Sequence, residues 1–373
     1  MNDYLRAPFP YFGGKSQAAS LVWSALGDVE VYVEPFAGSC AALLLRPERH
    51  RRRVETVNDA DGLLCNAWRG IHLAPEETAR HADWPVSEAD LHARHIWLVQ
   101  HRESVTEQVC ADPEWCDPRA AGWWIWGACC WIAGGWCSGN GAWTVEDGSL
   151  VKRTGSGGIK RQLPHLSGAG MGVHHPRLRT PGIDRKRPHL ANDGMGIHRP
   201  PWAAVGSASI YQWFAVLSER LRHARVCCGD WSRVCTPAGT HEHLQCRNGG
   251  TCGMFLDPPY AQAERRSDIY AIDADVAAAV RAWCLEHTAT QHLRVVLAGY
   301  EGEGHEPLEA AGWRVVSWKG RGMLTGGYKG RGEKSTETQT NMRERLWLSP
   351  GCLTEQAEVQ LDMWAPGGEA GGG

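Results

Sequence analysis

The chain lacks a strong charge bias, a high cysteine content and a recognisable leader. Its 39 Lys and Arg residues nearly balance 42 Asp and Glu residues, for a net charge of −3, which excludes a wholly basic nucleic-acid coat protein. Its 14 cysteines among 373 residues fall below the roughly 8–10% typical of a disulfide scaffold. Residues 1–6 carry no basic stretch followed by an apolar run, so we expect no signal peptide. The sequence therefore predicts a cytoplasmic protein with reduced thiols.

One uncharged run, from Ala120 to Cys137, is long enough to be considered as a membrane span. Its 18 residues reach the minimum length of such a span, about 17–20 residues. However, five of them are Trp, four are Gly, and none is Leu, Val or Phe. Because Trp favours the interface of a bilayer over its centre, we predict a buried Trp-rich segment and no membrane partner.

The remaining composition is that of a globular α/β protein. Hydrophobic residues make up 43% of the chain and charged residues 22%, and 373 residues suffice for one large or two modest domains. Near the N-terminus, a strand over 29–33, a helix over 40–45 and a strand over 53–57 form a βαβ pattern. Beyond residue 205 we expect helices over 207–221 and 273–287, strands over 224–228, 254–256 and 293–297, and a closing strand pair over 313–318 and 344–348.

The segment between about residues 70 and 205 differs from both flanking regions. After the Trp-rich run it becomes loop-like, with many Gly, Pro, His and Arg residues. Residues 164–174 are echoed by residues 188–198 at an offset of 24 residues, which we interpret as a duplicated surface loop because two copies are too few for a solenoid. Residues 151–200 carry ten Lys and Arg residues against two acids. A solvated loop stays an alternative, but this concentration favours an arm that contacts phosphates.

The strongest chemical signal is Asp257-Pro258-Pro259-Tyr260, which follows a short apolar strand. The exocyclic amine of a nucleobase is a poor nucleophile because its lone pair is delocalised into the ring. Acceptors for its N–H groups draw the lone pair back to nitrogen; Asp257 offers a carboxylate and Pro258 a carbonyl oxygen. The prolines restrict the backbone that carries these acceptors, and Tyr260 offers a face on which a flipped base can stack. The alternative interpretation is a plain strand-ending turn.

A second candidate motif runs from Glu34 to Ser39, between a predicted strand and a predicted helix. Gly38 permits the close approach of a ligand, and the N-terminus of the following helix presents amides to a carboxylate. Asp59, at the end of the next strand, suits ribose hydroxyls, although an exposed loop carboxylate is the simpler interpretation. The residues 13–15, Gly-Gly-Lys, are flexible and cationic but lack the spacing of a P-loop.

Together these motifs resemble those of the Dam-like adenine-specific DNA methyltransferases, a family with many phage-encoded members. The resemblance covers residues 8–69 and about 210–352, with residues 344–350 similar to a C-terminal signature of the phage members. It implies an α/β fold with a Rossmann-like S-adenosylmethionine-dependent methyltransferase core. It assigns cofactor binding to Tyr11, Gly13, Gly14, Lys15, Glu34, Pro35, Phe36, Ala37, Gly38, Ser39, Asp59 and Asp230. It assigns catalysis to Asp257, Pro258, Pro259 and Tyr260.

The resemblance also implies how the chain is organised and what it acts on. Residues 1–70 and 205–352 would form a discontinuous catalytic core, residues 70–205 an inserted target-recognition domain, and residues 353–373 a flexible tail. The implied reaction moves a methyl group from S-adenosylmethionine to N6 of adenine in double-stranded DNA after base flipping. No metal is required, because the sulfonium methyl group is already activated. A monomer is expected, and a cognate restriction endonuclease is left open as a partner.

Several alternatives stay open at this point. The catalytic tetrad also suits N4 of cytosine or an amine in RNA, and a catalytically silent DNA-binding homologue would keep the same motifs. His241, His243, Cys246 and Cys252 lie within 12 residues, as zinc ligands often do. Their spacing matches no standard zinc finger, so we interpret this segment as a polar connecting loop.

Overall fold

The computed structural model describes the strands, helices and several of the loops of this chain. The described residues are 5–11, 18–47, 54–131, 136–137, 143–146, 148–152, 190–191, 197–198, 210–241, 250–259, 276–287, 290, 292–317 and 344–354. Most of the predicted duplicated loop, most of the basic region over 151–200 and nearly all of the predicted tail lie outside these residues.

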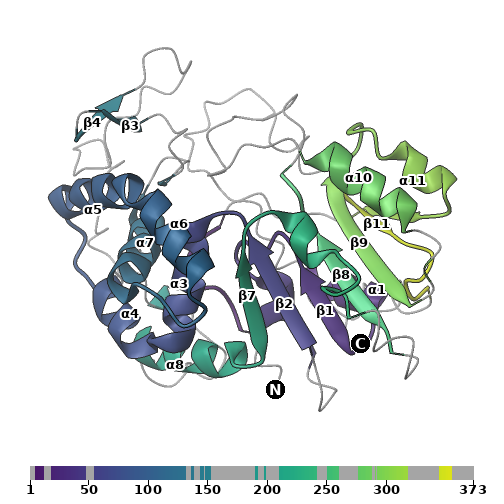
Figure 1. The fold of residues 1–373 in the computed structure, drawn as a ribbon, viewed down its shortest axis with the longest axis horizontal. Coiled ribbons are helices and arrows are strands. Elements are labelled where there is room, and N and C mark those ends of the chain that lie inside the picture. Colours follow the sequence, from purple (N-terminus) through teal and green to yellow (C-terminus); the bar gives the residue numbers. More distant parts are fainter. Residues whose placement is uncertain are drawn as a thin grey trace, which may run out of the picture.

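Seven strands form one mixed sheet in the order β10-β11-β9-β8-β1-β2-β7 (Figure 1). The neighbouring pairs are parallel except for those of β11, which runs antiparallel to both β9 and β10. The bounds are β1 Val31–Glu34, β2 Val54–Asp59, β7 Ala224–Cys228, β8 Cys252–Leu256, β9 Leu293–Tyr300, β10 Arg314–Ser317 and β11 Glu344–Leu348. Each strand predicted from the sequence is confirmed, and the strands of the predicted closing pair, β10 and β11, run antiparallel.

Helices cover both faces of this sheet, because alternate strand residues point to opposite sides. Tyr32 and Phe255 pack with α1 (Ala19–Leu26), α3 (Gly62–Leu73) and α8 (Ile210–Leu221). Val33 and Leu256 pack on the other face with α10 (Ala277–Glu286), α11 (Glu306–Ala310) and the 3₁₀ helix η2 (Trp231–Val234). The central strands are therefore buried on both sides, as is usual for a parallel sheet, and they read as apolar runs in the sequence.

The segment predicted as an insert begins with four helices that lie beside α3. They are α4 Pro75–Ala82, α5 Glu88–Gln100, α6 Arg102–Ala111 and α7 Pro118–Cys130. The Trp-rich run forms most of α7, in which Trp124 and Trp126 are buried, so this prediction is confirmed over the described residues. Gly122 lets α7 approach α4 closely, because a Cβ at this position would lie 2.6 Å from the Thr78 carbonyl oxygen.

These helices do not form a core that is separate from the sheet domain. α4 and α7 both pack against α3, and side chains of α7 belong to the same buried cluster as Tyr32 and Phe255. Within the described residues, every helix is too short or too polar to cross a lipid bilayer. After α7 come the hairpin β3 (Trp143–Glu146) and β4 (Ser149–Lys152) and the short parallel pair β5 (Leu190–Ala191) and β6 (Ile197–His198).

Candidate functional site

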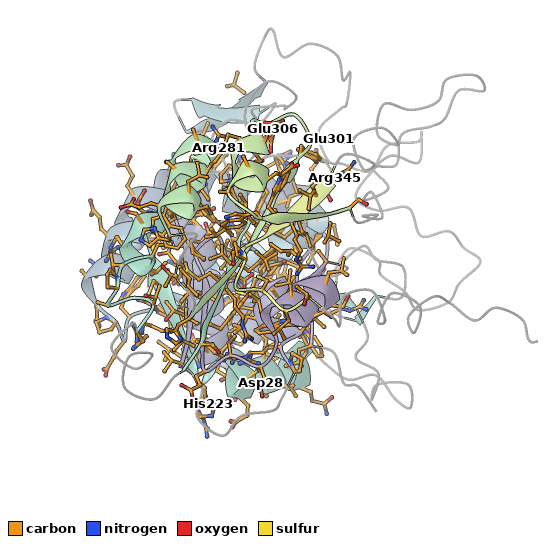
Figure 2. All side chains as sticks on the ribbon, turned by 90° about the vertical axis from the view of Figure 1, so that its right-hand side faces the viewer. Asp28, His223, Arg281, Glu301, Glu306 and Arg345 are labelled. Atoms are coloured by element: carbon orange, nitrogen blue, oxygen red, sulfur yellow. The ribbon has the colours of Figure 1, made fainter. Side chains whose placement is uncertain are left out.

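The order of the sheet reverses at β1, which lies between β2 and β8. In open parallel sheets, ligands bind at the carboxyl edge where such a reversal occurs. Asp28 and His223, which precede β1 and β7, lie at the edge of the sheet opposite to Glu301, which follows β9 (Figure 2). Because β1, β2, β7 and β8 are parallel, the candidate residues that follow them all lie at the same edge as Glu301.

The loop after β1 is held against the end of β2 by hydrogen bonds. The Ala37 amide donates to the carbonyl oxygen of Asn58 at 2.8 Å, and the Gly38 amide donates to Asp59 Oδ2 at 3.0 Å. The carbonyl oxygen of Gly38 accepts from Trp68 Nε1, on α3, at 2.9 Å. This loop and the Asp59 carboxylate, which the sequence motifs placed at one cofactor site, are therefore in direct contact.

Glycine is required at position 38 for two independent reasons. Its φ is +48°, in the left-handed region where other residues are strained. A Cβ would also lie 2.6 Å from Cε1 of the Tyr11 ring, which packs over the loop. The segment that carries Tyr11 is fixed by Phe9, whose ring contacts Trp68 and Trp124 at centroid distances of 5.3 and 5.0 Å. The N-terminal segment thus closes one side of the loop.

Asp59 is a half-buried carboxylate with acceptor capacity left over. Its Oδ2 accepts from the Gly38 amide and its Oδ1 from the Asp61 amide, each at 3.0 Å. Burial raises the pKa of Asp59 to about 6, although these backbone hydrogen bonds act to lower it. Ala60 adds a third backbone hydrogen bond, so of the four lone pairs on the two carboxylate oxygens one remains for a further donor, for example a ribose hydroxyl.

Asn58 links the loops that follow β1 and β7. Its Nδ2 donates to the Pro35 carbonyl oxygen at 3.1 Å and to the Gly229 carbonyl oxygen at 3.0 Å. The Gly229 amide returns a hydrogen bond to the carbonyl oxygen of Asp59 at 2.9 Å. Asn58 is only 1% exposed, so the two hydrogen bonds that its side chain donates are shielded from water. One buried amide therefore sets the position of two loops at the carboxyl edge.

The same two loops also meet through their aromatic side chains. Phe36, after β1, stacks on Trp231, after β7, with the ring centroids 6.0 Å apart and the planes at 29°. Asp230, directly before Trp231, is exposed and accepts hydrogen bonds from the amide and the hydroxyl of Ser232 at the start of η2. The side chain predicted to lie beside the cofactor therefore sits next to an apolar, aromatic wall.

Glu34 is buried beneath this loop. Its carboxylate is 2% exposed, and Oε2 accepts from the Tyr32 hydroxyl at 3.0 Å and from the Leu43 amide at 3.1 Å. Burial raises the pKa of Glu34 to about 8, and the nearby charge of Asp257 adds to the rise. The helix after the loop, α2 (Ala41–Leu44), is a single turn. Its Leu43 amide donates to Glu34, so this amide cannot bind a ligand carboxylate, contrary to the expectation from the sequence.

Asp257, Pro258 and Pro259 follow β8 directly and lie beside the loop after β1. β8 pairs with β1 in parallel, with Val33 opposite Met254, so the two strands end within one residue of the same level. Asp257 and Pro259 are half-buried, and Pro258 is buried. The predicted catalytic carboxylate therefore lies at the same edge as Gly38 and Asp59.

Sequence reasoning missed three residues that shape this edge. Asn58 and Trp68 hold the loop after β1, and Trp231 supplies its aromatic neighbour. The available signals were an Asn directly before the candidate acid Asp59 and a Trp directly after the candidate acid Asp230. The predicted site residues Gly13, Gly14, Lys15 and Tyr260 lie outside the described residues, as do His243 and Cys246 of the weighed zinc cluster.

Comparison with protein-family models and with curated proteins finds no match for the chain. Among the described residues, no group of three or more His, Cys, Asp and Glu side chains is arranged to hold a metal ion. The geometry at the carboxyl edge, which joins Gly38, Asp59 and Asp257, is thus the main feature from which a function can be argued.

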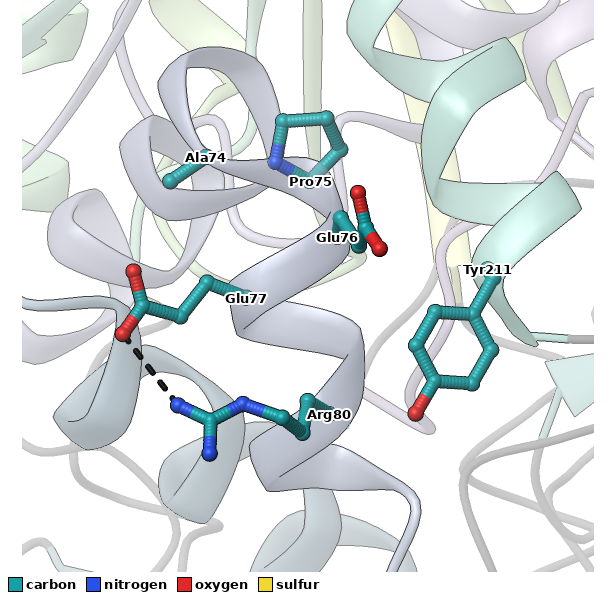
Figure 3. Close-up of a pocket in the computed structure, with 6 residues that line it drawn as sticks. All are labelled: Ala74, Pro75, Glu76, Glu77, Arg80 and Tyr211. Atoms are coloured by element: carbon teal, nitrogen blue, oxygen red, sulfur yellow. Dashed lines mark hydrogen bonds and ion pairs between the residues drawn. The ribbon is translucent and has the colours of Figure 1, made fainter.

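A surface hollow of about 630 Å³ lies away from this edge (Figure 3). Its lining includes Pro75, Glu76 and Arg80, from α4, and Tyr211, from the start of α8. α3 begins just after the carboxyl end of β2 and, at about 1.5 Å per residue, carries the chain roughly 18 Å away before α4 starts. The hollow and the loop cluster are therefore separate features of the molecule.

Proposed function

We propose that the chain is an S-adenosylmethionine-dependent DNA methyltransferase that modifies N6 of adenine in double-stranded DNA. The strand order supports this proposal. Numbered along the chain, the seven strands of the main sheet stand in the order 3-2-1-4-5-7-6, and the first five follow the doubly wound order. The antiparallel last strand, inserted beside the fifth, fits the methyltransferase core that the sequence motifs resemble.

Three predicted motifs lie together where the strand order reverses at β1, and this observation supports the proposal most strongly. Gly38 and Asp59 are joined by a hydrogen bond of 3.0 Å, and Asp257 follows the strand on the other side of β1. A nucleoside cofactor needs a close backbone approach and a hydroxyl acceptor at this edge of the sheet. Gly38, with no Cβ, and Asp59, with free acceptor capacity, meet both needs.

The chain's own residues would bind the cofactor and orient it. Asp59 accepts from the ribose hydroxyls, and the aromatic wall of Phe36 and Trp231 borders the adenine beside Asp230. When bound, S-adenosylmethionine supplies a methyl group activated by a sulfonium. The two hydrogen bonds of Asn58 hold both loops in place before the cofactor binds. Less conformational entropy is then lost when the cofactor binds.

The chemistry that the protein contributes centres on the amine. Asp257 and the Pro258 carbonyl oxygen accept its two N–H groups and concentrate the lone pair on nitrogen, which favours in-line attack. Pro258 and Pro259 restrict the backbone at the end of β8, so the acceptors are positioned before the base enters. This pre-organisation contributes mainly to the rate of transfer rather than to cofactor binding.

The basic residues over 151–200 suit contact with DNA. Net charge across the chain is −3, so the ten Lys and Arg residues of this region form a local excess that would neutralise phosphates. Flipping the target base out of the duplex costs a few kcal/mol, which contacts of this kind can offset. We infer a cytoplasmic enzyme that acts on duplex DNA as a monomer.

The test is a comparison of binding and transfer in one variant. Asp257→Ala should abolish transfer of labelled methyl to DNA while the dissociation constant for S-adenosylmethionine, measured by calorimetry, stays near that of the wild type. Asp28→Ala is the control, because Asp28 is an exposed carboxylate at the opposite edge of the sheet (Figure 2). Normal turnover in Asp257→Ala, or no cofactor binding by the wild type, would refute the proposal.

A further inference from the structure

An exposed arginine on α7 is held in place by two tryptophan rings. Cζ of Arg119 lies 5.0 Å from the centre of the Trp97 ring, on α5, and 5.2 Å from the centre of the Trp123 ring, one turn further along α7. The two rings are nearly perpendicular, at 88°, with their centroids 5.5 Å apart. Both distances from Arg119 are within the range of a cation–π contact. Arg119 therefore lies in an aromatic corner formed by Trp97 and Trp123.

The N–H groups of this arginine can bind a ligand. Arg119 is exposed, and within the part of the chain that the structure describes it makes no hydrogen bond and no ion pair. The arginines of the adjacent helices are engaged: Arg80, on α4, pairs with Glu77 at 3.3 Å, and Arg94, on α5, is buried with its Cζ 4.3 Å from the centre of the Trp126 ring. Arg119 thus has five N–H donors to offer to a partner molecule.

The aromatic corner is connected to the carboxyl edge of the sheet. Trp97 stacks on His101, the residue that follows α5, with the ring centroids 4.0 Å apart. The next residue, Arg102, lies 3.9 Å from the carboxylate of Asp61. The Asp61 amide in turn donates to Asp59 Oδ1, in the candidate site, at 3.0 Å. A short series of contacts therefore leads from the candidate site to the aromatic corner.

The basic region of the chain also starts next to this surface. The hairpin of β3 and β4 contacts α5 (Figure 1), and a Cβ at Gly148, in the turn of the hairpin, would lie 3.8 Å from Nε2 of Gln100, the last residue of α5. β4 ends at Lys152, where the basic region over 151–200 begins. A polyanion attracted to this region would therefore come close to the end of α5 that carries Trp97.

We propose that Arg119 binds a backbone phosphate of the duplex DNA that the enzyme modifies. This inference rests on the proposed function, because it concerns how the same substrate is held. A guanidinium presents pairs of N–H groups in one plane, which match two oxygens of a phosphate. The rings of Trp97 and Trp123 restrict this plane before DNA binds, so less side-chain entropy is lost on binding. A phosphate contact of this kind adds affinity and fixes the position of the duplex, but it does not read the base sequence.

Fluorescence anisotropy with a labelled DNA duplex, over a series of salt concentrations, tests the contact. Arg119→Gln removes one phosphate contact, so the slope of the logarithm of affinity against the logarithm of salt concentration should fall by about one, with roughly tenfold weaker binding at low salt. Arg119→Lys keeps the charge but loses the planar guanidinium, so it should keep the slope and weaken binding about two- to tenfold. Lys and Gln are both good helix formers, so both variants should fold.

Arg222→Gln is the matched control. It also removes one exposed positive charge, but it lies directly before His223, at the opposite edge of the sheet (Figure 2), so it should change neither the slope nor the affinity. An unchanged slope in Arg119→Gln, or an equal fall in Arg222→Gln, would overturn the phosphate contact while the proposed function still stands. Wild-type affinity in Arg119→Lys would overturn the role of the two rings. If the wild type binds no duplex DNA at any salt concentration, the proposed function fails together with this inference.

Discussion

Replacing Asn58 with alanine tests whether one side chain holds the two loops of the candidate site. The Asn58 amide donates to the carbonyl oxygens of Pro35 and Gly229 at 3.1 and 3.0 Å, from a side chain that is 1% exposed. Alanine removes both hydrogen bonds and leaves two carbonyl oxygens without this donor. Water can reach the half-buried Gly229 more easily than the buried Pro35. The unsatisfied Pro35 carbonyl oxygen therefore accounts for most of the expected loss of stability.

The size of the effect follows from these contacts. Each hydrogen bond contributes about 1 kcal/mol, and a carbonyl left unsatisfied in a buried setting costs about 1–3 kcal/mol. We therefore expect Asn58→Ala to lower the free energy of unfolding by roughly 2–4 kcal/mol. Because Asn58 links the loops that carry Gly38 and Trp231, the dissociation constant for S-adenosylmethionine should also rise about tenfold, a loss of about 1.4 kcal/mol.

A matched control separates stability from site geometry. Asn66 is 0% exposed and exchanges two hydrogen bonds of 2.9 Å with the backbone of Asp117, which joins α3 to α7. Asn66→Ala should lose similar unfolding free energy in urea but keep the affinity for S-adenosylmethionine in calorimetry. An equal loss of affinity in both variants, or none in Asn58→Ala, would refute the idea that Asn58 positions the site.

Three further predictions concern the surrounding network. Gly38→Ala puts a Cβ at a φ of +48° and 2.6 Å from the Tyr11 ring, so urea unfolding should show a loss of roughly 2–4 kcal/mol. The pKa of Glu34 rises from 4.5 to about 8 through burial, so the folded chain keeps a proton that the unfolded chain loses. Stability should fall as pH rises between these values, by at most about 1.4 kcal/mol per pH unit, and Glu34→Gln should flatten this profile in thermal melts. Arg220→Ala removes contacts of 2.7 and 3.0 Å to the buried Glu55, which keeps its 3.0 Å ion pair with Arg46, and should cost roughly 1.5–3 kcal/mol in urea unfolding.

Each of these variants has a control elsewhere in the chain. Gly302 also has a positive φ, +87°, but nothing lies within 4 Å of a Cβ there, so Gly302→Ala should show only the backbone cost of about 1–2 kcal/mol. Glu30→Gln is the control for Glu34→Gln, because it makes the same change from carboxylate to amide at an exposed position before β1. Arg222→Ala breaks an exposed pair with Glu219 and should cost less than about 1 kcal/mol. Equal effects in a variant and its control would contradict the reasoning for that variant.

Strands β8 and β9 could be predicted because they are buried on both faces and so form short apolar runs between turns. The edge strands β7 and β10 are partly exposed, and their predicted runs at 224–228 and 313–318 rest on a few β-branched or apolar residues. The order and direction in which distant strands pair were harder to predict, because pairing depends on side chains far apart in the sequence. The antiparallel position of β11 between β9 and β10 brings Glu344 opposite Tyr300, which no local pattern indicates.

The helices between residues 70 and 120 were not predicted individually; the amphipathic pattern is weak in α5 and α6, although it is clear in the short helix α4. Much of their burial depends on other helices: Gly70 on α3 contacts Ala121 and Thr78, and Gly122 on α7 contacts α4. Glycine in a helix interior usually argues against a helix, since it costs about 1 kcal/mol relative to alanine. Here close helix packing offsets that cost, and such packing becomes visible only in the assembled structure.

In the candidate site, the sequence indicated which residues lie at the carboxyl edge of the sheet, but it did not indicate the contacts that each of them makes. Gly38, Asp59 and Asp257 lie at one edge as the motif order predicts. Glu34 belongs to the same motif but is buried under the loop with Tyr32 and Leu43. Its role depends on which side of the backbone it faces at the end of β1, and a linear motif does not specify this. Asn58 was missed for the same reason.

We propose that Asp257, at the same sheet edge as Gly38 and Asp59, directs a methyl group to the amine of adenine. Mass analysis of nucleosides from duplex DNA that has been incubated with the protein and isotope-labelled S-adenosylmethionine tests this role. We expect labelled N6-methyladenine with the wild type and none with Asp257→Ala. Labelled N4-methylcytosine, label in RNA alone, or no labelled nucleoside from a wild type that binds the cofactor would contradict it.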